Sequence, residues 1–235
     1  EAYIDLIFNE ISHLFDGEKE HLSTFTLLPP AEWYVEEELA GVFQLLYPES
    51  EFKADTLDRL TEKGWLQREE DPTRLLAYKI HPLIQDVAVS RLGITADRAG
   101  AVIRSVGERI HYSATDPGHN LFEKVKNKPP ADYLKKRFRN ARTVQIAYLL
   151  DRIAHLEENF GQYMVAASIG EKAYEITLEV LGPEHPYVAV SQSNLANVYS
   201  ALGQYEKARD LLEAALASDL KNFGPEHPTV AVSQS

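Results

Sequence analysis

Two histidines with the chemistry for metal binding, His185 and His227, stand in the same tripeptide, Glu-His-Pro. Imidazole nitrogen is a common zinc ligand, and a neighbouring carboxylate could complete a site. The two histidines lie 42 residues apart in near-identical segments. If these segments stack as equivalent parts of a repeated structure, packed helices would place them about 10 Å apart. Zinc–nitrogen bonds are only about 2.1 Å long, so we expect helix-start roles and no metal.

The remaining candidates for catalysis are two acidic runs, Glu36-Glu37-Glu38 and Glu69-Glu70-Asp71. Paired carboxylates can act as general acid and base. The first run opens a predicted helix, where negative charge is favourable, and the second lies in a polar turn. The sequence has no cysteine, no His-Glu-x-x-His, no nucleophile elbow and no Gly-x-x-x-x-Gly-Lys-Ser/Thr phosphate loop. We therefore expect no catalysis and no cofactor in this chain.

Composition narrows the class of protein further. Hydrophobic residues make up 44% of the chain, enough for packed cores, and no apolar run reaches the roughly 18–20 residues of a membrane span. The net charge of −12 comes from acidic excess in residues 1–92 and 141–235, whereas residues 93–140 are basic. We expect a cytoplasmic protein that binds neither membrane nor, by default, nucleic acid. The chain begins Glu-Ala-Tyr without methionine, which suggests a piece of a longer protein.

A duplication organises the C-terminal part. The segment 181–193 returns as 223–235 with two changes, a period of 42 residues. Apolar residues recur every three or four positions on both sides of Gly203-Gln204, which predicts two amphipathic helices joined by a tight turn. Residues 141–235 are thus expected to hold a degenerate first copy, one full repeat and a truncated third.

The repeat resembles the tetratricopeptide repeat, in its 42-residue kinesin-light-chain form. The segments Asn194–Tyr199, Leu202–Tyr205 and Gly182–Pro186 carry the resemblance. In that family the first helix of each repeat lines a groove that holds a peptide or protein partner. Carried over by register, the groove residues here are Arg152, His155, Val190, Ser193, Asn194, Asn197 and Ser200, with Tyr148, Asp151 and Glu158 beside them. The alternative for Asn194 and Asn197 is hydrogen bonding within the stack of repeats.

Residues 1–92 have a different pattern. Apolar spacing and stop signals predict helices and one β-hairpin. The helices are expected at 3–15, 21–28, 36–46, 54–63 and 82–91, and the hairpin strands at 65–68 and 75–80.

Helices followed by a hairpin and another helix are typical of a winged helix. The segments Leu27–Pro30, Gly64–Leu66 and Ile80–Ala88 resemble the winged-helix domain of STAND signalling ATPases of the NB-ARC class. In that class this domain stands between a nucleotide-binding domain and a repeat sensor. The resemblance makes His81 a possible nucleotide sensor in the parent protein, although Pro82 replaces the family's aspartate. ATP or ADP would bind only in that intact protein. The alternative is that His81 and Pro82 simply start a helix.

Residues 93–140 are predicted to be a helical connector, with a helix at 96–112, a loop at 113–120 and a further helix interrupted by Pro129-Pro130. Its basic cluster with interleaved aromatic residues, including Lys135, Lys136 and Arg137, could bind nucleic acid. The alternative is a solvated face, or a surface that docks on an acidic domain.

The sequence therefore predicts a mostly α-helical protein: a winged helix with a small β-hairpin, then an α-α superhelix of repeats. We expect a non-catalytic, regulatory fragment of a signalling ATPase whose partners are a protein or peptide and an upstream nucleotide-binding domain. The alternative function is a nucleic-acid-binding regulator that uses the winged helix and the basic connector.

Overall fold

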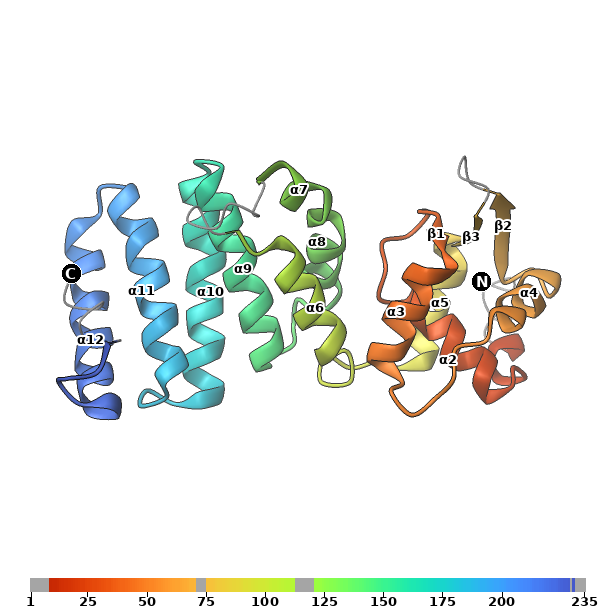
Figure 1. The fold of residues 1–235 in the computed structure, drawn as a ribbon, viewed down its shortest axis with the longest axis horizontal. Coiled ribbons are helices and arrows are strands. Elements are labelled where there is room, and N and C mark those ends of the chain that lie inside the picture. The colour runs from red at the N-terminus through yellow and green to blue at the C-terminus, as the bar shows by residue number, and fades with distance from the viewer. Residues whose placement is uncertain (1–8, 71–74, 113–120, 229, 231–235) are drawn as a thin grey trace. The chain divides into compact units, whose positions relative to one another are not determined.

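The computed structural model describes residues 9–70, 75–112, 121–228 and 230 (Figure 1). The chain divides into two compact units, Glu1–Val102 and Ile103–Ser235, here called the N-terminal and C-terminal units. Most described residues are helical, and a small antiparallel sheet accompanies the helices of the N-terminal unit.

The N-terminal unit combines helices with a three-stranded sheet of order β1-β3-β2. The predicted helix at 36–46 and the last helix are confirmed. The hairpin is confirmed as well, but its first strand extends through Glu70, so Glu69 and Glu70 pair within the sheet and do not lie in the turn. The helix predicted at 21–28 instead spans Asp16–Phe25. The sequence did not indicate β1, which pairs Tyr34 with Tyr78. Residues 9–12 are helical, but residues 13–15 are not, so the helix predicted at 3–15 ends earlier than expected; its residues 3–8 lie outside the described part of the chain. The elements are α2 Asp16–Phe25, β1 Tyr34–Val35, α3 Glu36–Leu46, α4 Ala54–Glu62, β2 Leu66–Glu70, β3 Leu76–Ile80 and α5 Pro82–Leu92.

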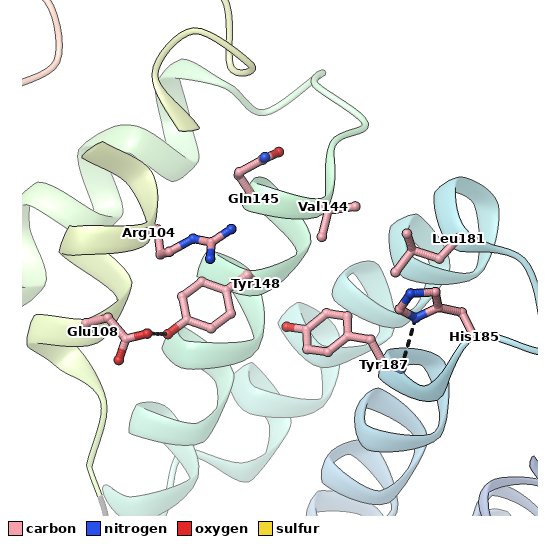
Figure 2. A pocket seen from close by; sticks show the side chains of 8 residues that line it. All are labelled: Arg104, Glu108, Val144, Gln145, Tyr148, Leu181, His185 and Tyr187. Carbon is pink, nitrogen blue, oxygen red and sulfur yellow. Dashed lines mark hydrogen bonds between the residues drawn. The ribbon is translucent and has the colours of Figure 1, made fainter. Parts of the chain in front are cut away.

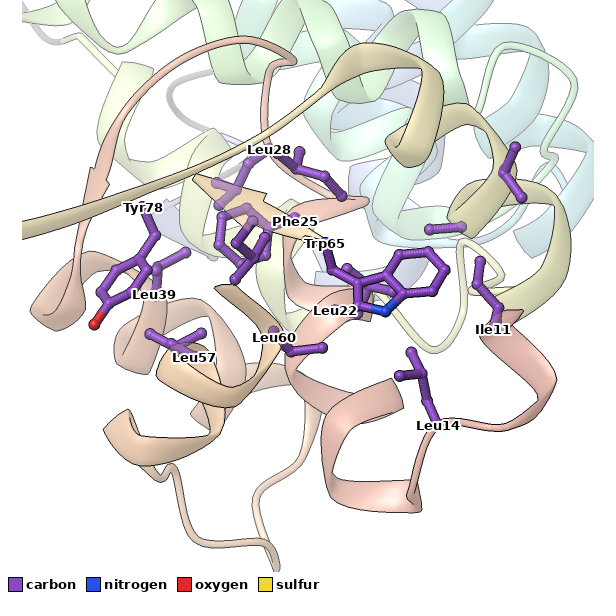
Figure 3. Packing of buried hydrophobic residues seen from close by; sticks show 14 residues of the cluster. Ile11, Leu14, Leu22, Phe25, Leu28, Leu39, Leu57, Leu60, Trp65 and Tyr78 are labelled. Atoms are coloured by element: carbon purple, nitrogen blue, oxygen red, sulfur yellow. The ribbon is translucent and has the colours of Figure 1, made fainter. Parts of the chain in front are cut away.

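The core of this unit lies between the helices α2, α3, α4 and α5 and the sheet (Figure 3). Leu22, Leu60 and Tyr78 are fully buried in it, and Trp65 is nearly so. The buried Tyr78 hydroxyl donates to carboxylate oxygens of Asp58 and Glu36, so its polar end is satisfied. The first acidic run, Glu36-Glu37-Glu38, therefore has a structural role. It starts α3, as the helix prediction implied.

A buried histidine joins α2 to the loop before α4. His21 is 3% exposed and packs against the rings of Phe43 and Phe52. Its Nδ1 donates to the Gly17 carbonyl at 2.7 Å, and its Nε2 accepts from the Lys53 amide at 3.0 Å. Both ring nitrogens are occupied only when the imidazole is neutral. Burial lowers the pKa of His21 below its ordinary value of 6.5.

We expect the N-terminal unit to lose stability as the pH falls below about 6.5. The unfolded chain then takes up a proton that the folded His21 resists, which favours unfolding. Urea midpoints followed by tryptophan fluorescence at pH 7.5, 6.5 and 5.5 measure this, because Trp33 and Trp65 both belong to this unit. His21→Gln should flatten the dependence. An unchanged wild-type midpoint between pH 7.5 and 5.5 would contradict the expectation.

Within its described residues, the C-terminal unit consists of helices joined by turns and short irregular segments. The predicted helix pairs of the repeats are confirmed as α9–α10 and α11–α12. The predicted helix is interrupted at Asn127, between α7 and α8, and the prolines 129 and 130 lie in the first turn of α8, where a missing amide proton costs little. The predicted loop at 113–120 lies outside the described residues. The helices are α6 Gly100–Ile110, α7 Leu121–Lys126, α8 Lys128–Arg137, α9 Val144–Asn159, α10 Tyr163–Leu181, α11 Pro186–Ala201 and α12 Tyr205–Phe223.

The two repeats share their turns but differ in packing. Gly161 and Gly203 both have positive φ, 72° and 73°, which lets each helix pair reverse within a short turn. The first repeat has Glu157 at the position of Tyr199, and this buried carboxylate is paired with Lys128 of α8 at 2.5 Å. Its departure from the repeat pattern thus follows from the helix that precedes it.

Candidate functional site

Three helices, α6, α9 and α11, contribute neighbouring residues to one face of the C-terminal unit. The contacts between them join residues about one repeat length apart. Tyr148 of α9 bonds to Glu108 of α6, and Asn194 of α11 bonds to Asp151 of α9. These pairs are 40 and 43 residues apart in sequence. The helix α6, predicted as a connector, therefore occupies the place of a first helix of a repeat.

The helix α6 packs closely against α9. Gly107 faces the ring of Tyr148, and a Cβ atom at Gly107 would lie 2.7 Å from Cε1 of that ring. The Tyr148 hydroxyl donates to the carboxylate of Glu108 (Figure 2). Burial and this hydrogen bond raise the pKa of Tyr148 to about 12. The tyrosine is therefore a protonated donor at neutral pH.

A polar network occupies the middle of this face. Asp151, 4% exposed, accepts from Asn194 Nδ2 at 2.9 Å and from Arg152 Nη2 at 3.0 Å. The second guanidinium nitrogen of Arg152 donates to His111 Nδ1 at 2.6 Å. Since Arg152 and Asp151 neutralise each other, the middle of the face offers little net charge to a ligand.

A cavity of about 340 Å³ opens at one end of the face (Figure 2). Within the described part of the chain, the buried hydroxyl of Tyr187 has no hydrogen-bond partner and Arg104 has no ion pair. Burial raises the pKa of Tyr187, so its hydroxyl stays protonated and can donate. The cavity is lined by Arg104 and Glu108 of α6, Val144, Gln145 and Tyr148 of α9, and Leu181, His185 and Tyr187.

The C-terminal end of α9 carries a negatively charged side chain, opposite in sign to Arg104. Glu158 is half-buried, and its carboxylate has no hydrogen bond or ion pair with any residue that the structure describes. Burial and the nearby Asp151 raise its pKa. Glu158 lines a small cavity together with Ser191. Ser191 is 3% exposed, and its hydroxyl has no hydrogen-bond partner among the described residues. His155 also lines this cavity, and burial lowers the pKa of that imidazole.

The predicted groove residues of the second repeat differ in solvent exposure. Val190 is 43% exposed and Asn197 is exposed, whereas Ser193 and Ser200 are half-buried. Asn194 already bonds to Asp151, as the alternative reading of that residue suggested. A role for these residues in binding a partner stays a prediction.

His81 and His185 are both N-cap residues of helices. Each precedes a proline and starts a helix, and Nδ1 of each accepts the amide proton two residues on, in α5 and α11 respectively. His81 lies in the N-terminal unit and is exposed. Its proposed nucleotide contact stays a prediction about the longer protein. Among the described residues no group of three or more histidines and carboxylates could hold a metal ion.

His185→Ala is expected to destabilise the C-terminal unit by about 1 kcal/mol, because the start of α11 loses its side-chain cap. His185→Asn should retain most of the stability, since an asparagine oxygen can accept the same proton. Urea unfolding followed by far-UV circular dichroism measures both variants. Equal losses would show that the hydrogen bond contributes nothing.

Sequence reasoning missed α6 as a wall of this face, and with it Arg104 and Tyr187 as cavity residues. A weak signal exists, because Glu108-Arg109-Ile110 resembles Asp151-Arg152-Ile153 at a spacing of 43 residues. Ile110 and Ile153 are both fully buried, as equivalent core positions would be.

Comparisons with known proteins match the helices from α9 onward to a repeat family. The tetratricopeptide repeat family model matches residues 145–221 and 192–235. A search of solved structures finds BtubC (BKLC) from P. vanneervenii, with 20% sequence identity and a TM-score of 0.42. The alignment covers 63% of this chain and 54% of that one, so this chain spans about half the length of that structure. No curated protein matches the chain. No helix of the described residues has the length and apolarity to cross a membrane. The part of the chain from residue 145 onward therefore contains tetratricopeptide repeats.

Proposed function

We propose that the chain is a non-catalytic interaction and regulatory part of a signalling ATPase, in which the repeats hold a protein or peptide partner. The family match to tetratricopeptide repeats is the observation that carries the proposal. Repeat proteins present an extended concave surface to their partners. The face of α6, α9 and α11 supports this role, since it combines a cavity with exposed Val190 and Asn197.

The N-terminal unit is proposed to be a winged helix that belongs beside a nucleotide-binding domain of the same cytoplasmic protein. The order α4, hairpin β2–β3, α5 supports this assignment, and so does the position of His81 at the start of α5. We further propose boundaries at 1–92 for this domain, 93–140 for the connector and 141–235 for the repeats. The complete coding sequence should contain a phosphate loop upstream, and its absence would refute the ATPase assignment.

The nucleic-acid alternative has less support, because many of the cations it needs are already paired. In the N-terminal unit, Arg59 bonds to Asp55 at 2.8 Å and Lys63 bonds to the buried Glu18 at 2.6 Å. In the connector, Lys128 and Lys135 are also in ion pairs. Paired cations release few counterions from phosphates. Retention on DNA or RNA that falls steeply with salt would favour this alternative.

A displayed library of random peptides tests partner binding. We expect peptides selected on the wild-type chain to bind about threefold to tenfold more weakly to Val190→Ala and Asn197→Ala, since each loses a contact of about 0.7–1.4 kcal/mol. Glu206→Ala, an exposed change at the start of α12, is the matched control. Failure to select any peptide, or equal binding by all variants, would contradict the proposed function.

A further inference from the structure

We propose that the partner segment held by this face carries an acidic group and, about six residues away, a basic group. The inference rests on the proposed function and specifies the chemistry of its partner. It follows from two groups of opposite charge without an ion pair among the described residues, Arg104 of α6 beside the start of α9 and Glu158 near its end, with a neutralised network between them.

The end near α6 suits an acidic side chain. Arg104 lines the 340 Å³ cavity without an ion pair among the described residues, and the Tyr187 hydroxyl points into the space beside Tyr148 (Figure 2). Both groups are donors, so a carboxylate would satisfy both. Glu108 lies one turn further along α6 and lines the same cavity, where its carboxylate accepts the Tyr148 hydroxyl proton, so Arg104 is the donor that a partner carboxylate would bind. The tyrosine rings and Leu181 supply apolar walls for the stem of the side chain.

The far end suits a basic side chain. The half-buried carboxylate of Glu158 has lost part of its water without gaining a partner from the described residues, which is unfavourable for its charged form. The unpartnered, buried Ser191 hydroxyl can accept a hydrogen bond in the same cavity. The cavity has room for a group of about the size of a water molecule, which fits the tip of a lysine side chain and not an extended anion.

The distance between the ends sets the spacing in the partner. Glu108 of α6 contacts Tyr148, and His111, just after α6, contacts Arg152, which are offsets of 40 and 41 residues. The same offset places Arg104 beside Gln145 of α9, and both residues line the cavity. Glu158 is 13 residues further along α9 than Gln145, which corresponds to about 20 Å of helix at 1.5 Å per residue. An extended chain covers that distance in about six residues.

Peptide selection with charge reversal tests the inference. Random 12-residue peptides are selected on the wild-type chain and on the double variant Arg104→Glu, Glu158→Lys. The wild type should enrich peptides with an acidic and a basic residue about six positions apart. These peptides should bind the double variant about tenfold or more weakly, because both ends now repel them. The double variant should enrich the opposite order of charges along the peptide.

The control reverses an ion pair elsewhere in the same unit. Arg209→Glu, Glu213→Lys keeps the same net charge and changes exposed residues of α12. It should bind the selected peptides as the wild type does. Arg104→Gln and Glu158→Gln repeat the comparison with smaller changes, and thermal unfolding of each variant confirms that it folds.

The outcomes separate the inference from the proposed function. Peptides that bind the wild type but show no spaced charges, or that bind the reversed variant equally well, would overturn the inference and leave partner binding intact. Selection that yields no peptide at all would overturn both. A charge pattern that inverts with the double variant would establish the polarity of the groove.

Discussion

Asp151→Ala is expected to destabilise the C-terminal unit by about 3–5 kcal/mol. The substitution leaves the guanidinium of Arg152, whose side chain is 16% exposed, without its ion-pair partner. It also removes the acceptor of Asn194, so α9 and α11 lose a hydrogen-bonded link. Removing one member of a buried pair costs more than the pair itself contributes, because the other charge stays desolvated.

The measurement uses two signals, one from each unit. Far-UV circular dichroism in urea follows all helices, whereas tryptophan fluorescence follows the N-terminal unit, which contains Trp33 and Trp65. The dichroism transition of Asp151→Ala should move to lower urea while the fluorescence transition stays in place. Asp210→Ala is the control, since its ion pair with Arg209 is exposed and contributes about 0–1 kcal/mol. A shift no larger than that of the control would contradict the prediction.

Gly107→Ala is expected to destabilise the C-terminal unit by about 1–3 kcal/mol through overpacking. The added methyl group would stand 2.7 Å from the ring of Tyr148, which the hydrogen bond to Glu108 holds in place. Alanine normally stabilises a helix by up to about 1 kcal/mol relative to glycine, so the sign of the effect is diagnostic. Gly41→Ala in α3, where a Cβ atom meets nothing within 4 Å, should show that gain.

A second substitution distinguishes overpacking from a backbone effect. Tyr148→Leu removes the ring that Gly107→Ala would strike, so the double variant should lose less stability than the sum of the single variants. The urea midpoint from circular dichroism gives all four values of the cycle. A stabilised Gly107→Ala would mean that α6 does not pack closely on α9, and the cavity beside Arg104 would then lack its wall.

Local signals were sufficient for the repeats. Gly161 and Gly203 mark turns that need positive φ, and the spacing of apolar residues fixed the helices on either side. The same register placed Val190, Asn194 and Asn197 on one face. It could not show that Asn194 bonds to Asp151, because that contact depends on a side chain 43 residues earlier.

Other features gave too little signal to be predicted. The strand β1 has two residues, which is too short for an alternating pattern. Only Glu108-Arg109-Ile110 hinted that α6 corresponds to α9, and three residues cannot establish a repeat. The cavity residues Arg104 and Tyr187 belong to different helices, so their proximity arises from packing and not from local sequence.

The hydrogen bonds of three histidines have a spectroscopic consequence. His21 must carry its proton on Nδ1, because that atom donates to a carbonyl. His81 and His185 must carry it on Nε2, because their Nδ1 atoms accept amide protons. The folded chain thus fixes opposite imidazole tautomers, whose nitrogen-15 resonances differ widely. His21 and His185 give each unit a native reporter of its own, with no label added to the chain.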